Sequence, residues 1–483
     1  MFKKIIYFFQ IFMLFIECKK KIIDPPEPPI PKNYDYILLD WEDRIIPPSG
    51  TRGKWIYIIG GNREGTYFVS PNGNDSDPGT REKPWKTISY ATTRLSPGDT
   101  LVILPREGNR RPIIAGGNNL AHAIDLSGKS YIWIENIEIT HNDTLKGEGK
   151  YFRDAIYICD LPSTNIVLKN IYIHHIDEFG INIKDIDSLT IIGCRIEYCG
   201  FGSVGGPKGV QGGWRNVIIR GCTLSYSGHY YGPGIDNNPY TRPDGLGVEE
   251  SNGPLLVENT IAMHNKGDGL DSKVKNTTIK ECIVANNSCD GVKLWGDSSR
   301  VINTLIYGKG DRDTTHIPWG SIVIDQVEKP NSTFEIINCT VDDTLGIVSV
   351  MYVQTTEGYR DIPVNLKLIN NIFSGKGRNC YIGIGRASQI TAKNNLFYFP
   401  KSFYALQHGD NIYDSTNIGN LGPGNIYGRP LFVRTAWGEI GDYHLRDGSP
   451  AIDRGTSDNA PNIDLEGKPR PQGNGFDIGC YER

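Results

Sequence analysis

The chain repeats one short phrase along most of its length, and this repeat restricts the fold more than any other feature. Each copy has three or four residues that favour β-strands, then Asn or Cys, then further strand-forming residues. The Asn or Cys residues of successive copies, which we call marks, lie 21 to 37 residues apart. This spacing indicates a coil of 21 to 24 residues with loops inserted in the longer copies. We place these marks at one equivalent position: Asn136, Asn170, Cys194, Cys222, Asn259, Cys282, Asn303, Cys339, Asn371 and Asn395.

Strands this short cannot bury a face alone, whereas stacked coils bury a continuous core and pair their inner edges. We therefore predict an all-β fold, a right-handed parallel β-helix, because parallel crossovers are almost always right-handed. The repeated Asn side chains would hydrogen-bond to their equivalents in the next coil. The repeated Cys residues are expected to be small buried side chains, and a disulfide between Cys194 and Cys222 stays open as an alternative.

Composition excludes some functions and helps to divide the chain. With 51 Lys and Arg against 55 Asp and Glu, the net charge is -4, which leaves no basic surplus for a nucleic-acid partner. We expect a monomer. We divide the chain into four parts: residues 1–18, a signal peptide; 19–60, a Pro-rich tether and leading segment; 61–427, the β-helix; and 428–483, a C-terminal cap or appendage.

Both ends of the chain carry local signals. Two lysines precede an apolar run from Ile5 to Ile16, as in a signal peptide, so we expect a secreted or cell-surface protein of a bacterium. Cys18 directly follows, as in a bacterial lipoprotein signal, although Glu17 replaces the usual small residue. A lipid on Cys18 would be the membrane anchor. A helical face of Ile88, Ala91 and Leu95 predicts a short helix that caps the first coil. Short strands are expected over 441–445, 449–453 and 477–482.

A second phrase recurs half a coil away from the first. It reads Asp-Gly-Leu-Gly-Val-Glu over 244–249, Asp-Gly-Leu-Asp-Ser-Lys over 268–273 and Asp-Gly-Val-Lys-Leu-Trp over 290–295. One coil separates successive copies, so equivalent residues would stack about 4.8 Å apart. Side chains alternate along a strand, so the apolar residues should point inward. Three columns should point outward: Asp244, Asp268 and Asp290; Gly247, Asp271 and Lys293; Glu249, Lys273 and Trp295.

Crowded carboxylates repel one another unless a cation neutralises them, and clusters with oxygen ligands suit Ca²⁺. Asp244, Asp268 and Asp271 can converge on one ion from two adjacent coils, with Glu249 or waters completing the shell. Lys293 would stand one coil further along. The pattern therefore predicts a calcium site beside an amine.

These residues resemble the pectate lyases of polysaccharide lyase family nine. The resemblance lies in Asp-Gly at 244, Asp-Gly-Leu-Asp over 268–271 and Gly-Val-Lys-Leu over 291–294, and the segments 67–79 and 83–88 are similar to the start of many such secreted proteins. It covers residues 67–400. It implies a right-handed β-helix in which Asp244, Asp268 and Asp271 bind Ca²⁺ and Lys293 is the base of a β-elimination. Gly267 departs from the family, which has another aspartate there, and the step from Asp271 to Lys293 is shorter.

The expected substrate is an acidic, pectate-like polysaccharide that contains uronates. Arg242 and Lys273 are expected to hold substrate carboxylates, and Trp295 or Trp214 to stack on a sugar. The loops 228–242 and 312–319 would wall the groove.

Several alternatives stay open at this point. A glycoside hydrolase could pair Asp244 with Asp290, about 9.6 Å apart over two coils. A C5-epimerase or a noncatalytic glycan-binding surface protein would also fit, because each Asp-Gly pair can be a simple turn.

Overall fold

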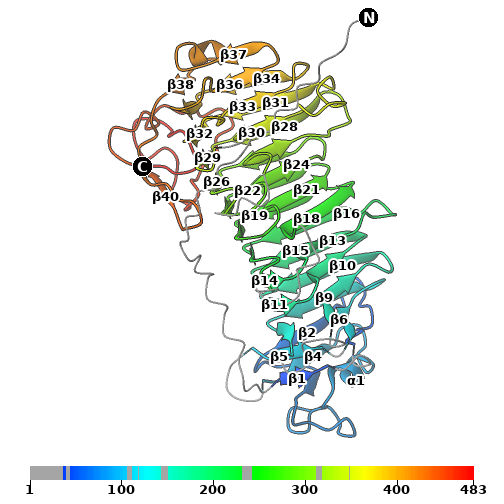
Figure 1. Ribbon diagram of the computed structural model, residues 1–483. Helices are drawn as coiled ribbons and strands as arrows, with labels where there is room; N and C mark the ends of the chain where they lie inside the picture. Colours follow the sequence, from blue (N-terminus) through cyan, green and yellow to red (C-terminus); the bar gives the residue numbers. More distant parts are fainter. Residues whose placement is uncertain are drawn as a thin grey trace, which may run out of the picture. The chain divides into compact units, whose positions relative to one another are not determined.

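Short strands from successive coils stack into three parallel sheets, which we name sheets 1, 2 and 3 (Figure 1). The computed structural model describes residues 36–39, 44–105, 111–117, 119–142, 151–230, 242–311, 318–346 and 349–483. The expected signal peptide, Cys18 and most of the tether lie outside the described residues. Within these ranges, no helix is both long and apolar enough to span a membrane.

Sheet 1 carries the second sequence phrase. Its strands, in chain order, are β6 (Leu120–Asp125), β9 (Phe152–Ile158), β12 (Phe179–Ile183), β15 (Gly202–Gly206), β18 (Asp244–Ser251), β21 (Leu270–Val274), β24 (Val292–Leu294), β27 (Ile322–Ile324), β30 (Met351–Val353), β33 (Ile382–Ile384), β36 (Leu406–His408) and β37 (Asn411–Tyr413). The pairs are parallel except β36 with β37, which form an antiparallel hairpin on the last coil.

Sheets 2 and 3 complete each coil. Sheet 2 contains β2 (Ile56–Gly60), β3 (Tyr67–Val69), β4 (Thr100–Ile103), β7 (Ser130–Glu135), β10 (Ser163–Lys169), β13 (Ile186–Ile192), β16 (Trp214–Arg220), β19 (Leu255–Glu258), β22 (Thr277–Lys280), β25 (Arg300–Ile302), β28 (Ser332–Ile337), β31 (Val364–Ile369) and β34 (Gln389–Lys393). Sheet 3 contains β1 (Tyr36–Leu38), β5 (Ile113–Gly116), β8 (Glu138–His141), β11 (Tyr172–Ile176), β14 (Arg195–Cys199), β17 (Thr223–Ser225), β20 (Ile261–Met263), β23 (Ile283–Ala285), β26 (Leu305–Tyr307), β29 (Thr340–Asp343), β32 (Ile372–Gly375), β35 (Leu396–Tyr398) and β38 (Ile426–Tyr427).

The parallel β-helix that the repeat predicts is confirmed. Equivalent apolar residues of successive coils pair in register and are buried, as Leu246, Leu270, Val292 and Ile322 are in sheet 1. Stacking therefore buries one continuous core, which no single coil could form. The strands β1 and β2 lie within the sheets, and the four-part division of the chain stays a prediction.

The single repeat position assigned from the sequence is wrong, because the structure resolves it into two adjacent positions. Asn136, Asn170, Asn259 and Asn303 have φ values of 61°, 49°, 48° and 50°, in the left-handed region that Asn tolerates better than most residues. The marked Cys residues, Asn371 and Asn395 come one residue later in their coils and are buried. Asn371 Nδ2 donates to Asn395 Oδ1 at 2.9 Å, which is the expected ladder. The left-handed backbone thus favours Asn at the first position, and hydrogen bonding between the side chains of successive coils favours Asn at the second.

The buried cysteines are free thiols, including Cys194 and Cys222. Burial raises the pKa of the Cys282 thiol to about 12, as expected for a small side chain in an apolar core.

The helix that caps the first coil is confirmed as α1 (Ile88–Thr92), where the Thr87 side chain accepts a hydrogen bond from the Tyr90 N–H. Ile88, Ala91 and Leu95 are buried, as the helical spacing predicts.

The C-terminal segment lies beside the later coils, next to sheet 3 (Figure 1). It contains the antiparallel pair β39 (Phe432–Arg434) and β40 (Asp442–Leu445), and a 3-10 turn, η2 (Ile418–Leu421), precedes it. The strand expected over 441–445 is confirmed, whereas those over 449–453 and 477–482 are wrong. These two segments are turns that side chains hold in place, since Asp477 Oδ1 accepts from the Asp453 N–H and Asn338 Nδ2 donates to the Gly479 carbonyl.

We expect Asp342 to make the free energy of unfolding depend on pH. Burial raises the pKa of this carboxyl from 3.8 to about 6, although it accepts hydrogen bonds from Ser374 and Tyr443. A raised carboxyl pKa gives stability that is complete below pH 3.8 and is lost as the pH rises through 6. The free energy of unfolding of Asp342→Asn, compared with that of the wild type, should therefore increase by about 3 kcal/mol as the pH rises from 3.5 to 7. Denaturant unfolding at several pH values tests this, with Asp410→Asn as the surface control. An equal pH profile for wild type and Asp342→Asn would contradict it.

Candidate functional site

Three successive coils of sheet 1 place the acids and the amine of the second phrase together. Asp244 begins β18, Asp268 lies two residues before β21, and Asp271 and Lys293 lie within β21 and β24. Gly247 pairs with Asp271, and Asp271 pairs with Lys293, as the column predicted. The register expected for the column of Gly247, Asp271 and Lys293 is therefore confirmed, whereas Glu249 lies in a register irregularity between Val248 and Ser251 and does not pair as predicted with Lys273.

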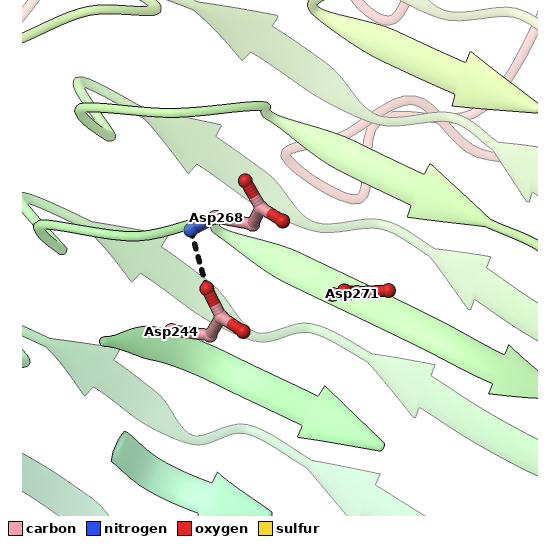
Figure 2. A group of neighbouring side chains, drawn as sticks. All are labelled: Asp244, Asp268 and Asp271. Carbon is pink, nitrogen blue, oxygen red and sulfur yellow. Dashed lines mark hydrogen bonds between the residues drawn. The ribbon is translucent and has the colours of Figure 1, made fainter. Parts of the chain in front are cut away.

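The three aspartates form a cluster, which we call the acid cluster (Figure 2). Each of Asp244, Asp268 and Asp271 offers one carboxylate oxygen, and these oxygens lie within 4.8 Å of one another. The backbone fixes two of them, because the Asp268 N–H donates to Asp244 Oδ1 at 2.6 Å and the Asp290 N–H donates to Asp268 Oδ1 at 2.8 Å. Each coil therefore orients the aspartate of the coil before it.

Lys293 lies within bonding distance of this cluster. Its Nζ donates to Asp268 Oδ2, and it lies 3.3 Å from Asp271 Oδ2 and 3.8 Å from Asp290 Oδ2. Burial alone would lower the pKa of Lys293, but the negative charges of Asp271, Asp268 and Asp290 outweigh burial and raise it. In this arrangement Lys293 is an ammonium and is the counter-cation of the acids.

The acids do not stand on an open outer face, as the alternation suggested. Asp268, Asp271, Asp290 and Lys293 are only 2%, 7%, 0% and 5% exposed. Aromatic rings lie close to the ammonium, since Lys293 Nζ is 5.8 Å from the centre of the Trp295 ring and 5.9 Å from that of Trp319. Low exposure strengthens every charge interaction inside the site.

The expected substrate-binding residues surround the acid cluster but already have partners. Arg242 Nη2 lies 3.5 Å from Asp268 Oδ1, and Arg242 Nε donates to Cys289 Sγ at 3.4 Å. Lys273 Nζ donates to Glu249 Oε1 at 2.6 Å and lies 5.0 Å from the Trp295 ring. Among the described residues, the buried Trp295 Nε1 has no hydrogen-bond partner. Most of both wall loops lies outside the described residues.

Two further side chains have roles that differ from the expectation or that the sequence reasoning missed. Trp214 is buried and donates to the Ile183 carbonyl, so its expected sugar-stacking role is wrong. Asp290 is fully buried, and its Oδ1 accepts from the Trp319 and Gly320 N–H groups, which anchors the following coil. Burial raises the pKa of Asp290 to about 6, and the charge of Asp268 adds to this effect. No spacing in the sequence distinguished Asp290 from the acids of the cluster.

The acid cluster fits a hard divalent cation such as Ca²⁺. Burial, together with the charges of Asp268 and Asp271, raises the pKa of Asp244 well above its ordinary value. Burial also raises the pKa of Asp271 despite the nearby Lys293. Among the described residues, Asp271 Oδ1 is a buried acceptor with no hydrogen-bond partner. Oxygen donors alone, incompletely neutralised and facing one another, are the ligand set that Ca²⁺ prefers.

Gly267 leaves no room for a fourth carboxylate at the position where the resembling family has an aspartate. A Cβ built there would lie 2.2 Å from Asp244 Oδ1 and 2.6 Å from the Arg242 carbonyl oxygen. This coil therefore accepts only glycine unless both Asp244 and the backbone at Arg242 move.

We expect Gly267→Ala to lower the free energy of unfolding by about 1 to 3 kcal/mol, because the new methyl group displaces Asp244 or the backbone at Arg242. Denaturant unfolding measures this change. Gly419→Ala is the matched control, since a Cβ there meets nothing nearer than 3.9 Å. Equal stability of the two variants would contradict the close approach.

The fold and the comparisons with known proteins define the class of the chain, a parallel β-helix protein. The family described as "Right handed beta helix region" matches residues 107–239 and 210–397, and the chain belongs to this family. This confirms the predicted hand. The uncharacterized protein YwoF of Bacillus subtilis (strain 168) is 44% identical over 50 residues, which is 10% of this chain and only 10% of that relative's length.

Several solved structures are similar to this chain at low sequence identity. The complex of XylC with xylose is 11% identical with a TM-score of 0.52, over 86% of this chain and 98% of that one. The pectate lyase Pel9A is 15% identical with a TM-score of 0.48, over 90% and 97%. A rhamnogalacturonan lyase is 15% identical with a TM-score of 0.47, over 68% and 87%.

Proposed function

We propose that the chain is a calcium-dependent polysaccharide lyase that cleaves an acidic, pectate-like polysaccharide by β-elimination. One observation carries the proposal: three aspartates offer oxygens within 4.8 Å of one another, and the amine of Lys293 bonds to the same cluster. A cation site and a base must adjoin in such an enzyme, because the proton at C5 of a uronate is only weakly acidic.

The proposed reaction assigns each residue a task. Asp244, Asp268 and Asp271 would hold Ca²⁺, which when bound draws electron density onto the uronate carboxylate. Lys293 Nζ takes the C5 proton, a double bond forms between C4 and C5, the bond from C4 to the glycosidic oxygen breaks, and the departing oxygen takes a proton from water. Lys293 keeps its own proton while Asp268 and Asp271 are its partners, so it acts as a base only when those carboxylates are otherwise neutralised.

The side chains around the acid cluster would bind the substrate. Arg242 can turn a guanidinium edge toward a uronate carboxylate, because its described bonds use only Nη2 and Nε. Lys273 supplies a second cation, held in place by Glu249. Trp295 supplies an unpartnered indole N–H and an aromatic face.

A hydrolase with a paired Asp244 and Asp290 has less support. Asp290 is fully buried and its carboxylate bonds to two backbone N–H groups of the next coil. An inverting pair needs a carboxylate that can activate a water molecule. Export from the cell, the lipid on Cys18 and the monomeric state remain predictions.

The test is the near-ultraviolet absorbance of products from a panel of uronic acid polymers, with and without a chelator. The proposal expects an unsaturated product on at least one polymer, lost with the chelator and restored by added Ca²⁺. Cleavage without that absorbance would instead indicate a hydrolase, and a changed sugar composition without cleavage an epimerase. Binding without any turnover would indicate a noncatalytic protein.

A further inference from the structure

A cavity lies where the C-terminal segment meets sheet 3, away from the strands of sheet 1 that carry the acid cluster. Its volume is about 470 Å³, which is within the range of ligand-binding pockets. Residues of β29, β32 and β35 line one side, and the segment 429–435, with β39, lines the other. We call it the appendage cleft.

Cations dominate the appendage cleft although the chain as a whole has a net charge of -4. Lys376, Arg429, Arg434 and Arg446 line it, and within the described ranges none of them forms an ion pair. Most of these cations have a neutral partner instead: Lys376 Nζ donates to Thr435 Oγ1 at 2.5 Å, Arg434 Nη2 to the Ile440 carbonyl at 3.0 Å, and Arg446 Nη2 to the Val433 carbonyl. These bonds hold the side chains without neutralising them.

The two acids that line the cleft offset only part of this charge. Asp342 is buried, and its two oxygens accept from Ser374 Oγ at 2.6 Å and Tyr443 OH at 3.0 Å. Asp447 pairs with Arg483, which is not among the lining residues. Four cations therefore line the cleft against two acids, and the cleft keeps a net positive charge.

Aromatic side chains stand beside the cations. Tyr398 and Phe432 both line the cleft, and both are partly exposed. An aromatic face packs against the apolar face of a sugar ring, and a guanidinium binds a carboxylate through two parallel hydrogen bonds. A ligand with sugar rings and carboxylates would use both kinds of group at once.

We propose that the appendage cleft is a second binding site, for a uronate-containing oligosaccharide. The choice of a uronate over another anionic sugar rests on the proposed function, whereas the anionic character of the ligand rests on the cleft alone. Because the cleft belongs to sheet 3 and the acid cluster to sheet 1, the cleft binds a stretch of polysaccharide that is not being cleaved.

The test is calorimetric titration of the full-length chain with trigalacturonate, in a chelator so that no turnover occurs. We expect binding of trigalacturonate but not of the neutral maltotriose. The double variant Arg429→Ala, Arg446→Ala should weaken binding at least tenfold. Arg429→Ala alone removes a side chain with no described partner, so it should weaken binding without affecting folding. Arg378→Ala, an exposed arginine outside the cleft, is the matched control.

Unchanged binding in the double variant, or an equal loss in Arg378→Ala, would overturn the proposal. Equal binding of a sulfated trisaccharide would overturn the assignment to uronates. The two proposals can fail separately. If the protein cleaves a polymer but the arginine variants bind trigalacturonate as the wild type does, only the second site is refuted. If the arginine variants abolish trigalacturonate binding but no polymer is cleaved, only the lyase is refuted.

Discussion

Lys293→Ala is expected to reduce turnover of the uronate polymer by about 1,000-fold, since a general base contributes 10² to 10⁴ in rate. Lys293→Arg should be equally inactive, because its guanidinium keeps a positive charge beside Asp268 and Asp271 but does not give up a proton. The comparison separates the two tasks of this side chain, counter-cation and base. The rate of formation of the unsaturated product measures the loss.

Stability must be measured on the same variants. Lys293→Ala leaves three buried carboxylates without their amine, so it should unfold at lower denaturant concentration than Lys293→Arg. Lys275→Ala, an exposed lysine two residues after Lys273, is the control and should keep full turnover. A Lys293→Arg enzyme with wild-type turnover would show that Lys293 is not the base.

Asp271→Asn is expected to raise the calcium concentration needed for half-maximal turnover by about 100-fold. Calcium affinity depends on how many charged oxygen ligands the site offers, and this change removes one of three. Asp271 is a better choice for the test than Asp268, because its Oδ1 has no hydrogen-bond partner among the described residues and its Oδ2 is bonded to Lys293 alone. Asp268 would be a poorer choice, since it bonds to Asp290, Arg242 and Lys293.

Calcium titrations of turnover, together with direct calorimetry of calcium binding, measure this effect. Asp325→Asn removes another buried carboxylate, one that accepts from Thr356, and should leave the calcium requirement unchanged. An Asp271→Asn protein with wild-type calcium affinity would show that the acid cluster does not hold the ion.

The sequence predicts the fold well because the β-helix is built from one repeated local rule. The spacing of the Asp-Gly phrases also predicts the register, so Gly247, Asp271 and Lys293 fall in one column as expected. The burial of that column could not be predicted. The alternation of side chains along a strand predicts which face of the sheet a residue occupies. It does not predict that the Trp295 and Trp319 rings lie beside the Lys293 ammonium.

Positions that depend on contacts between distant segments were also beyond the sequence. A register irregularity between Val248 and Ser251 includes the last residue of the phrase, Glu249, and nothing in the pattern signals it. The turns over 449–453 and 477–482 contain strand-forming residues, yet contacts with the side of the stack override that preference. Trp319 ends the loop 312–319 that was expected to wall the groove, but the backbone bond that holds it to Asp290 is a contact that no motif records.

The C-terminal segment alters how the stack can come apart. Coils that touch only their neighbours can peel away one at a time from a free end. Here the segment's carbonyls accept from side chains of four successive coils: Asn394 bonds to Arg454, Asn370 to Thr456, Asn338 to Gly479 and Asn303 to Ile463. The last coil cannot detach until this lateral brace is released, so these four coils open as one cooperative block.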